Sequence, residues 1–253
     1  MIALTSIVAA AGALLAGVVA GTTWRRMHAR PVPLVEVALA ICGVLGVAST
    51  MTFALMWLWT GAVLPRTGTG DDDPFFTAAL AGTVAGHLAL LGWARGVGAS
   101  LATRLVSLRW VFAGVAAGAL GVVVSGLWVE ALAALGLVVE DQEIVAQVVG
   151  GPAGAGRLVT LGFVVAGAPL LEELVFRGYV QTELARWVGP AIAAVASALC
   201  FGAFHLSEPA VVPVLTLIGG ALAWLRMRSG SVWPSVTGHL VNNTLAMWLA
   251  VGS

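Results

Sequence analysis

Charged residues are scarce in this sequence, and lysine is absent altogether. The 253 residues include 12 basic residues, all of them arginine, and 12 acidic ones, so only 9% are charged and the formal net charge is zero. An average soluble domain carries about 25% charged residues, and a nucleic-acid-binding protein carries a basic face. The composition argues against both classes, and we expect no nucleic-acid partner. The two cysteines, Cys42 and Cys200, lie inside apolar runs, which predicts neither a disulfide nor a CxxC metal site.

Apolar residues dominate the chain. They make up 60% of it, and the mean hydropathy is +1.00. They occur in runs of about 20 residues, the length at which a helix crosses roughly 30 Å of hydrocarbon. The sequence therefore predicts an all-α, polytopic transmembrane bundle of about eight spans, with membrane lipid as a partner. The expected spans are residues 2–22, 34–64, 75–94, 110–135, 158–187, 190–206, 210–227 and 232–250.

The arginines predict the orientation of this bundle. Ten of the 12 fall on one side in this arrangement, and only Arg66 and Arg157 fall on the other. By the positive-inside rule the arginine-rich side is cytoplasmic, which places both termini outside. The first run is followed by Trp24, Arg25 and Arg26, and we interpret it as a retained anchor. We expect a multi-pass protein of the cell membrane, and the Gly-, Ala- and Arg-rich composition favours a bacterial plasma membrane.

The longest connection, residues 136–157, has two interpretations. Ile144 and Val148 alternate with Glu143 and Gln147 at helical spacing, which predicts a helix on the outer membrane surface. An irregular connector is equally compatible with the pattern.

Ionisable residues within the spans concentrate in the C-terminal half. A charged group at a helix centre costs roughly 2.5–3.5 kcal/mol on insertion scales, so such groups are usually paired or functional. Glu172, Glu173 and Arg177 lie in one run. Glu173 precedes Arg177 by four residues, the order that favours an ion pair. Glu172 is rotated by about 100° from Glu173 and is available for chemistry.

Two histidines and an asparagine complete this polar set. Glu172 and His205 each lie about 16 residues from the turn at 188–190, so we expect them at the same depth. His239 and Asn243 are four residues apart and share one helix face.

The depth of His239 does not fit a straight helix. It lies about 9 residues into its span, so its depth differs from that of His205 by about 10 Å at 1.5 Å per residue. Helix tilt, or a break at Pro169 or Pro234, is expected to close this gap.

The motifs resemble those of the CPBP intramembrane proteases, the family of CAAX prenyl protease 2 and of Abi-like bacterial proteins linked to bacteriocin processing. Three family motifs, EExxxR, FxxxH and HxxxN, occur in the family's order. The matching residues are Glu172, Glu173, Arg177, Phe201, His205, His239 and Asn243. A weaker feature is the span between the histidines, where Gly219, Gly220 and Ala223 allow close helix contact. The resemblance implies a catalytic core at 158–253, preceded at 1–157 by four spans and an outer connector.

The resemblance implies an intramembrane endopeptidase that cuts a membrane-associated peptide or protein. Peptide hydrolysis needs an activated water, donors for the oxyanion and a proton for the leaving amine. In the preferred mechanism Glu172 is the general base, assisted by His205. His239 and Asn243 then donate to the oxyanion.

Glu173 and Arg177 are expected to hold this geometry or to contact the substrate, and no cofactor is required. The alternative mechanism makes Glu172, His205 and His239 zinc ligands with Glu173 as the base, a ligand set that catalytic zinc often uses. The absence of an HExxH helix favours the metal-free mechanism.

A non-catalytic membrane protein is the rival class. A transporter or an immunity partner could use the same polar cluster to bind an ion or a peptide without cutting it. An ion pathway needs carboxylates but not two histidines with an HxxxN face, so the three motifs favour the protease. The sequence leaves the substrate open, including whether it is prenylated.

Overall fold

The computed structural model describes residues 2–27, 54, 74–137, 143–150 and 155–252. Within these ranges every regular element is a helix and no strand occurs, which confirms the all-α class. The chain divides into two compact units, Met1–Leu101 and Ala102–Ser253. Apart from Ala54, the predicted second span, 34–64, lies outside the described residues.

The first unit contains two closely packed helices, α1 (Ile2–Met27) and α3 (Pro74–Gly96). Each carries a pair of glycines four residues apart, Gly17 and Gly21 on α1 and Gly92 and Gly96 on α3. A side chain added at any of these glycines would collide with the backbone of the other helix. This small-residue packing is typical of helices in membranes, where close backbone approach supplies the van der Waals attraction.

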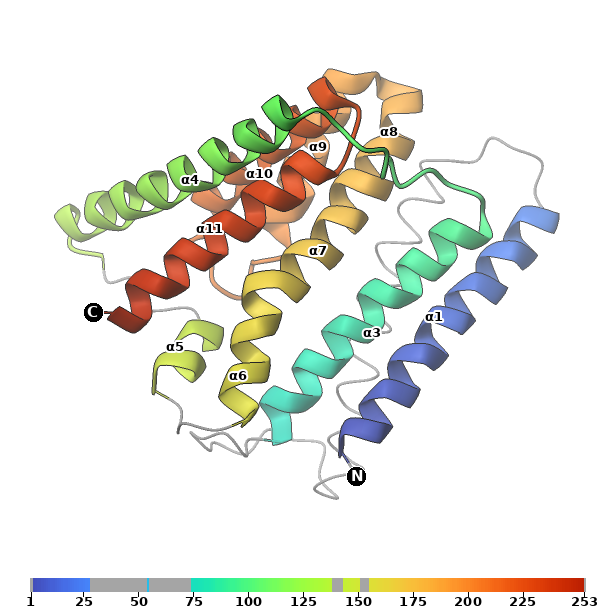
Figure 1. Cartoon of the computed structure of the whole chain (residues 1–253), viewed down its shortest axis with the longest axis horizontal. Helices are drawn as coiled ribbons and strands as arrows, with labels where there is room; N and C mark the ends of the chain where they lie inside the picture. The colour runs from blue at the N-terminus through green and yellow to red at the C-terminus, as the bar shows by residue number, and fades with distance from the viewer. Residues whose placement is uncertain (1, 28–53, 55–73, 138–142, 151–154, 253) are drawn as a thin grey trace. The chain divides into compact units, whose positions relative to one another are not determined.

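The second unit contains the residues of all three motifs (Figure 1). Its elements in chain order are α4 (Leu108–Ala134), α5 (Glu143–Gly150), α6 (Ala155–Gly162), η1 (Phe163–Gly167), α7 (Ala168–Glu173), η2 (Leu174–Val180), α8 (Gln181–Val188), α9 (Pro190–Ala203), α10 (Val212–Ser229) and α11 (Trp233–Gly252). Helix α10 packs against α9 and α4, and α4 lies along α11. The compact second unit begins at Ala102 and includes α4. The predicted division between N-terminal helices at 1–157 and a catalytic core at 158–253 stays a prediction.

Within the residues that the structure describes, two helices are long and apolar enough to cross a membrane. They are Leu108–Ala134, with a mean hydropathy of 2.0, and the continuous helix Arg157–Val188, with a mean hydropathy of 1.8. Large apolar side chains on α4 point outward, with Phe112 68%, Leu120 61% and Leu127 66% exposed. Such a surface suits contact with lipid. The count of eight spans remains a prediction.

Glycines also set the packing of α4 against α11. A side chain added at Gly114 or Gly118 would collide with the carbonyl of Pro234 or Gly238 on α11. The spacing Gly114-x-x-x-Gly118 is a known signal for close helix contact, and it was the sequence feature available to predict this pair.

Part of the connector at 136–157 is helical, namely α5 (Glu143–Gly150), while residues 138–142 and 151–154 lie outside the described residues. Within α5, Val148 is fully buried against Val164 and Met247, so this part of α5 packs on other elements of the second unit. The position of the connector on the outer membrane surface stays a prediction.

Candidate active site

The first motif forms a buried ion pair. Glu173 and Arg177 are both completely buried, and Arg177 Nη1 donates to Glu173 Oε1 at 2.9 Å. The guanidinium also donates through Nη2 to the Gly219 carbonyl at 2.9 Å and lies 4.5 Å from the centroid of the Phe201 ring. The predicted i, i+4 pair is confirmed. A carboxylate, a carbonyl and an aromatic face together fix the guanidinium.

His239 lies between the two glutamates. Its Nδ1 is 3.0 Å from Glu173 Oε1, and its Nε2 is 3.9 Å from Glu172 Oε2. His239 is 8% exposed and Glu172 is 18% exposed at the side chain, whereas Glu173 is fully buried. Of the two carboxylates, Glu172 is therefore the one that an incoming molecule can reach.

The ion pair determines which His239 nitrogen carries the proton. A Glu173 carboxylate paired with Arg177 can only accept hydrogen bonds, so His239 Nδ1 must be the donor. In the neutral ring Nε2 is then unprotonated and faces Glu172. Two acceptors share no proton and cannot bond to each other directly, but one water can donate a hydrogen bond to each across the 3.9 Å between them.

Asn243 is tied to an irregular turn in the long helix that carries the glutamates. In the π-helical segment η1 the Ala168 N–H donates to the Phe163 carbonyl, five residues back. The next donor in this register would be residue 169, a proline, which has no N–H. Asn243 Nδ2 fills the place and donates to the Val164 carbonyl at 2.9 Å. This bond joins α11 to η1.

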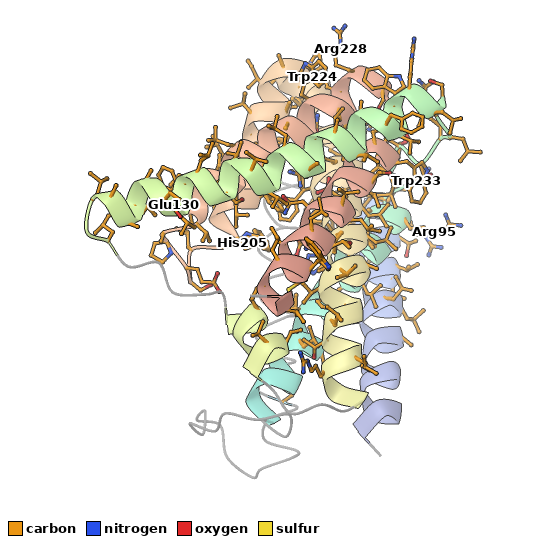
Figure 2. All side chains as sticks on the ribbon, turned by 60° about the vertical axis from the view of Figure 1, so that its left-hand side comes forward. Arg95, Glu130, His205, Trp224, Arg228 and Trp233 are labelled. Atoms are coloured by element: carbon orange, nitrogen blue, oxygen red, sulfur yellow. The ribbon has the colours of Figure 1, made fainter. Side chains whose placement is uncertain are left out.

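His205 lies in the turn just beyond the end of α9 at Ala203. Its Nδ1 donates to the Phe201 carbonyl at 3.0 Å, and its ring centroid is 5.2 Å from that of Phe201. The Phe201 ring also packs against His239, with centroids 5.6 Å apart, so it contacts both imidazoles. Figure 2 shows His205 at the end of the second unit away from Arg228.

The structure thus brings some of the predicted site residues together and leaves others apart. Glu172, Glu173, Arg177 and His239 form one connected group. Among the described residues, no carboxylate lies within ion-pair distance of His205. Pro234 lies in the first turn of α11 and interrupts no helix. The irregularity expected near Pro169 is a π-helical turn.

Three further polar contacts, which we did not predict, join the helices around the site. Gln181 Nε2 donates to the Ala223 carbonyl at 2.9 Å, one turn beyond the bond from Arg177 to Gly219. Ser197 Oγ donates at 2.9 Å to the Phe176 carbonyl within η2. Ser235 Oγ donates to the Leu222 carbonyl at 2.7 Å. The i, i+4 spacing of Arg177 and Gln181 was the only sequence signal for this arrangement.

The three ligands of the alternative zinc site, Glu172, His205 and His239, do not form a cluster in the structure. Within the ranges that the structure describes, no group of three or more His, Cys, Asp or Glu side chains is arranged to hold a metal ion. Glu172 and His239 are neighbours, but His205 does not complete a ligand set with them. The metal-free mechanism stays a prediction, which the chelator assay proposed below tests.

Gly219 provides a test of how tightly Arg177 is held. A Cβ at position 219 would lie 3.0 Å from Arg177 Nη2 and 3.0 Å from Phe201 Cδ1, so Gly219→Ala should displace the guanidinium and destabilise the protein by about 1–3 kcal/mol. At Gly220 the nearest atom to an added Cβ is the Ala198 Cβ at 4.0 Å, so Gly220→Ala should be neutral or slightly stabilising. Thermal unfolding in detergent, followed by circular dichroism, measures both. Equal melting temperatures for the two variants would contradict this packing.

Comparison with known families agrees with this geometry. Residues 154–245 match the family described as "Type II CAAX prenyl endopeptidase Rce1-like". The match begins just before α6 and includes all three motifs. Neither the curated proteins nor the solved structures contain a match to this chain. The predicted resemblance to the CPBP and CAAX proteases is confirmed for this segment.

Proposed function

Because residues 154–245 belong to the Rce1-like CAAX endopeptidase family, we propose that this chain is an intramembrane endopeptidase that cuts a membrane-associated substrate. The observation that carries the proposal is the pair of Glu172 Oε2 and His239 Nε2, which lie 3.9 Å apart. The His239 ring is held by Glu173, which is itself paired with Arg177. An apolar helix bundle has no structural need for two carboxylates on one imidazole. A hydrolase needs such a group to hold and activate water.

Glu172 is the proposed general base. A water donating to Glu172 Oε2 and His239 Nε2 keeps its lone pairs free to attack a peptide carbonyl. As the oxygen–carbon bond forms, Glu172 takes one proton. As the carbon–nitrogen bond breaks, Glu172 returns this proton to the leaving amine. His239 orients the water in this scheme, a position that the contacts favour over the oxyanion role first expected for it.

Asn243 is the proposed oxyanion donor. One of its two amide hydrogens is used by the Val164 carbonyl, and the second can donate to the negative oxygen that develops during attack. His205 stays proposed as an assisting group. Its Nδ1–H is given to the Phe201 carbonyl, which leaves Nε2 unprotonated and able to accept a proton.

A peptide assay on the purified full chain tests the proposal. Fluorogenic peptides of one sequence, farnesylated and unmodified, would be incubated with wild type and with Glu172→Ala in detergent. We expect cleavage by wild type only, and the preference between the two peptides gives the substrate class. Equal cleavage by both proteins would contradict the role of Glu172. Peptide binding without cleavage would favour the non-catalytic alternative.

Metal dependence is decided in the same assay. Elemental analysis of the wild type, read beside activity with and without chelator, separates the two mechanisms. The metal-free mechanism predicts chelator-resistant activity. One bound zinc per chain, required for activity and lost in His239→Ala, would replace it with the zinc mechanism.

A further inference from the structure

One end of the second unit carries several arginines and only one acidic residue among the described residues. It is formed by residues 102–109, which lead into α4, by α8 with the α8–α9 turn, and by the last turn of α10 with the α10–α11 turn. Figure 2 shows Arg228 and Trp224 there. The arginines on these segments are Arg104, Arg109, Arg186, Arg226 and Arg228. Glu183 is the single acid on them, and its carboxylate is already paired with Arg186 at 3.0 Å. The remaining positive charge is not neutralised by the described residues of these segments.

Arg104 is held in place over the end of α10. Its Nη2 donates to the Ser229 carbonyl at 2.9 Å, and its own carbonyl accepts from Ser231 Oγ at 2.6 Å. The neighbouring Thr103 carbonyl accepts from Trp233 Nε1 at 2.9 Å. Ala102, just before this segment, has a left-handed backbone with a φ of 52°, a conformation that costs a non-glycine residue free energy. The strained backbone at Ala102 thus lies two residues before Arg104.

Arg226 approaches from the last turn of α10. Its Nη2 donates to Thr182 Oγ1 at 2.8 Å, while its Nε is buried and has no partner among the described residues. Arg226 lies three residues before Ser229, whose carbonyl accepts from Arg104, so both arginines are placed at the C-terminal end of α10. The C-terminus of α10 attracts cations, but a helix end carries only about half a unit of negative charge. The helix end therefore cannot balance both guanidiniums.

Two guanidiniums from different elements, placed at one helix end, form a site for an anion with several oxygens. We propose that Arg104 and Arg226 together bind the phosphate of an anionic phospholipid headgroup. Guanidinium pairs bind phosphate through several charge-assisted hydrogen bonds. A lipid fits better than free phosphate because Trp224 and Trp187, 51% and 43% exposed, border this end. Exposed tryptophans on an apolar bundle are typical of the membrane interface.

The test measures lipid binding to the detergent-purified full chain and does not depend on protease activity. Dihexanoyl phosphatidylglycerol, dihexanoyl phosphatidylcholine and inorganic phosphate would each be titrated against tryptophan fluorescence. We expect phosphatidylglycerol to bind more tightly than the other two. Arg104→Gln and Arg226→Gln should each raise its Kd by about tenfold or more.

Two control variants separate the site from general effects of charge and folding. Arg228→Gln removes an exposed arginine from the same turn and should change Kd by no more than about threefold. Thr182→Val removes the Arg226 partner but keeps both guanidiniums, so binding should persist. Equal binding of phosphatidylcholine, equal binding of free phosphate, or a loss in Thr182→Val as large as in Arg226→Gln would overturn the proposal.

Discussion

Replacing Arg177 by methionine is expected to lower the free energy of unfolding by about 3–5 kcal/mol, the usual cost of removing one partner from a buried ion pair. Arg177 and Glu173 are both 0% exposed, so no solvent can replace the lost charge. The substitution also removes the donor to the Gly219 carbonyl and the cation on the Phe201 ring. Unfolding of the purified protein in mixed micelles measures the loss.

Two further variants show whether the loss comes from the unpaired carboxylate. Arg228→Met, at an exposed position on α10, should cost less than about 1 kcal/mol. The double variant Glu173→Gln with Arg177→Met should be more stable than Arg177→Met alone, because neither charge is then buried without its partner. If Arg177→Met and Arg228→Met were equally stable, Arg177 would not hold the site together.

Glu172→Gln is expected to abolish peptide cleavage and to leave the fold intact. The amide has nearly the shape of the carboxylate, but it cannot accept the proton of the attacking water. General-base catalysis contributes about 10²–10⁴ in rate. Glu172 makes no direct hydrogen bond to the described residues, so the melting temperature should stay close to that of the wild type. The control is Glu130→Gln, an exposed acid on α4, which should retain full activity.

Asn243→Ala separates the oxyanion role from a structural one. Loss of one oxyanion donor lowers the rate by about 10²–10³, but this variant also leaves the Val164 carbonyl without its donor. An unchanged melting temperature with a rate loss in that range supports the oxyanion role. A rate that recovers fully when the assay is run well below a lowered melting temperature would instead make Asn243 a structural residue.

The sequence predicted the parts of this structure that depend on local spacing. Runs of about 20 apolar residues predicted helices, and each predicted span within the described residues contains a helix, although the span 190–206 is helical only to Ala203. The i, i+4 rule predicted the Glu173–Arg177 pair. Rotation around the helix led us to expect different neighbours for Glu172 and Glu173, whereas both carboxylates lie beside His239.

The parts that depend on helix irregularity could not be predicted. Depth was counted at 1.5 Å per residue along straight α-helices, and this count does not hold where π-helical turns widen the helix that carries both glutamates. Pro169 indicated an irregularity but could not distinguish a π-helical turn from a kink. The position of His239 between two carboxylates depends on how α11 packs against α7. Local spacing in the sequence does not predict that packing.

The assignment of Glu172 as the base that activates water is most directly tested by product analysis in H₂¹⁸O. Wild type and Glu172→Gln would be incubated with a membrane-anchored peptide in proteoliposomes, and the products would be analysed by mass spectrometry. We predict that the wild type releases a fragment whose new C-terminal carboxylate contains ¹⁸O, while Glu172→Gln releases none. Release of the same labelled fragment by both proteins at the same rate would contradict the assignment of Glu172 as the general base.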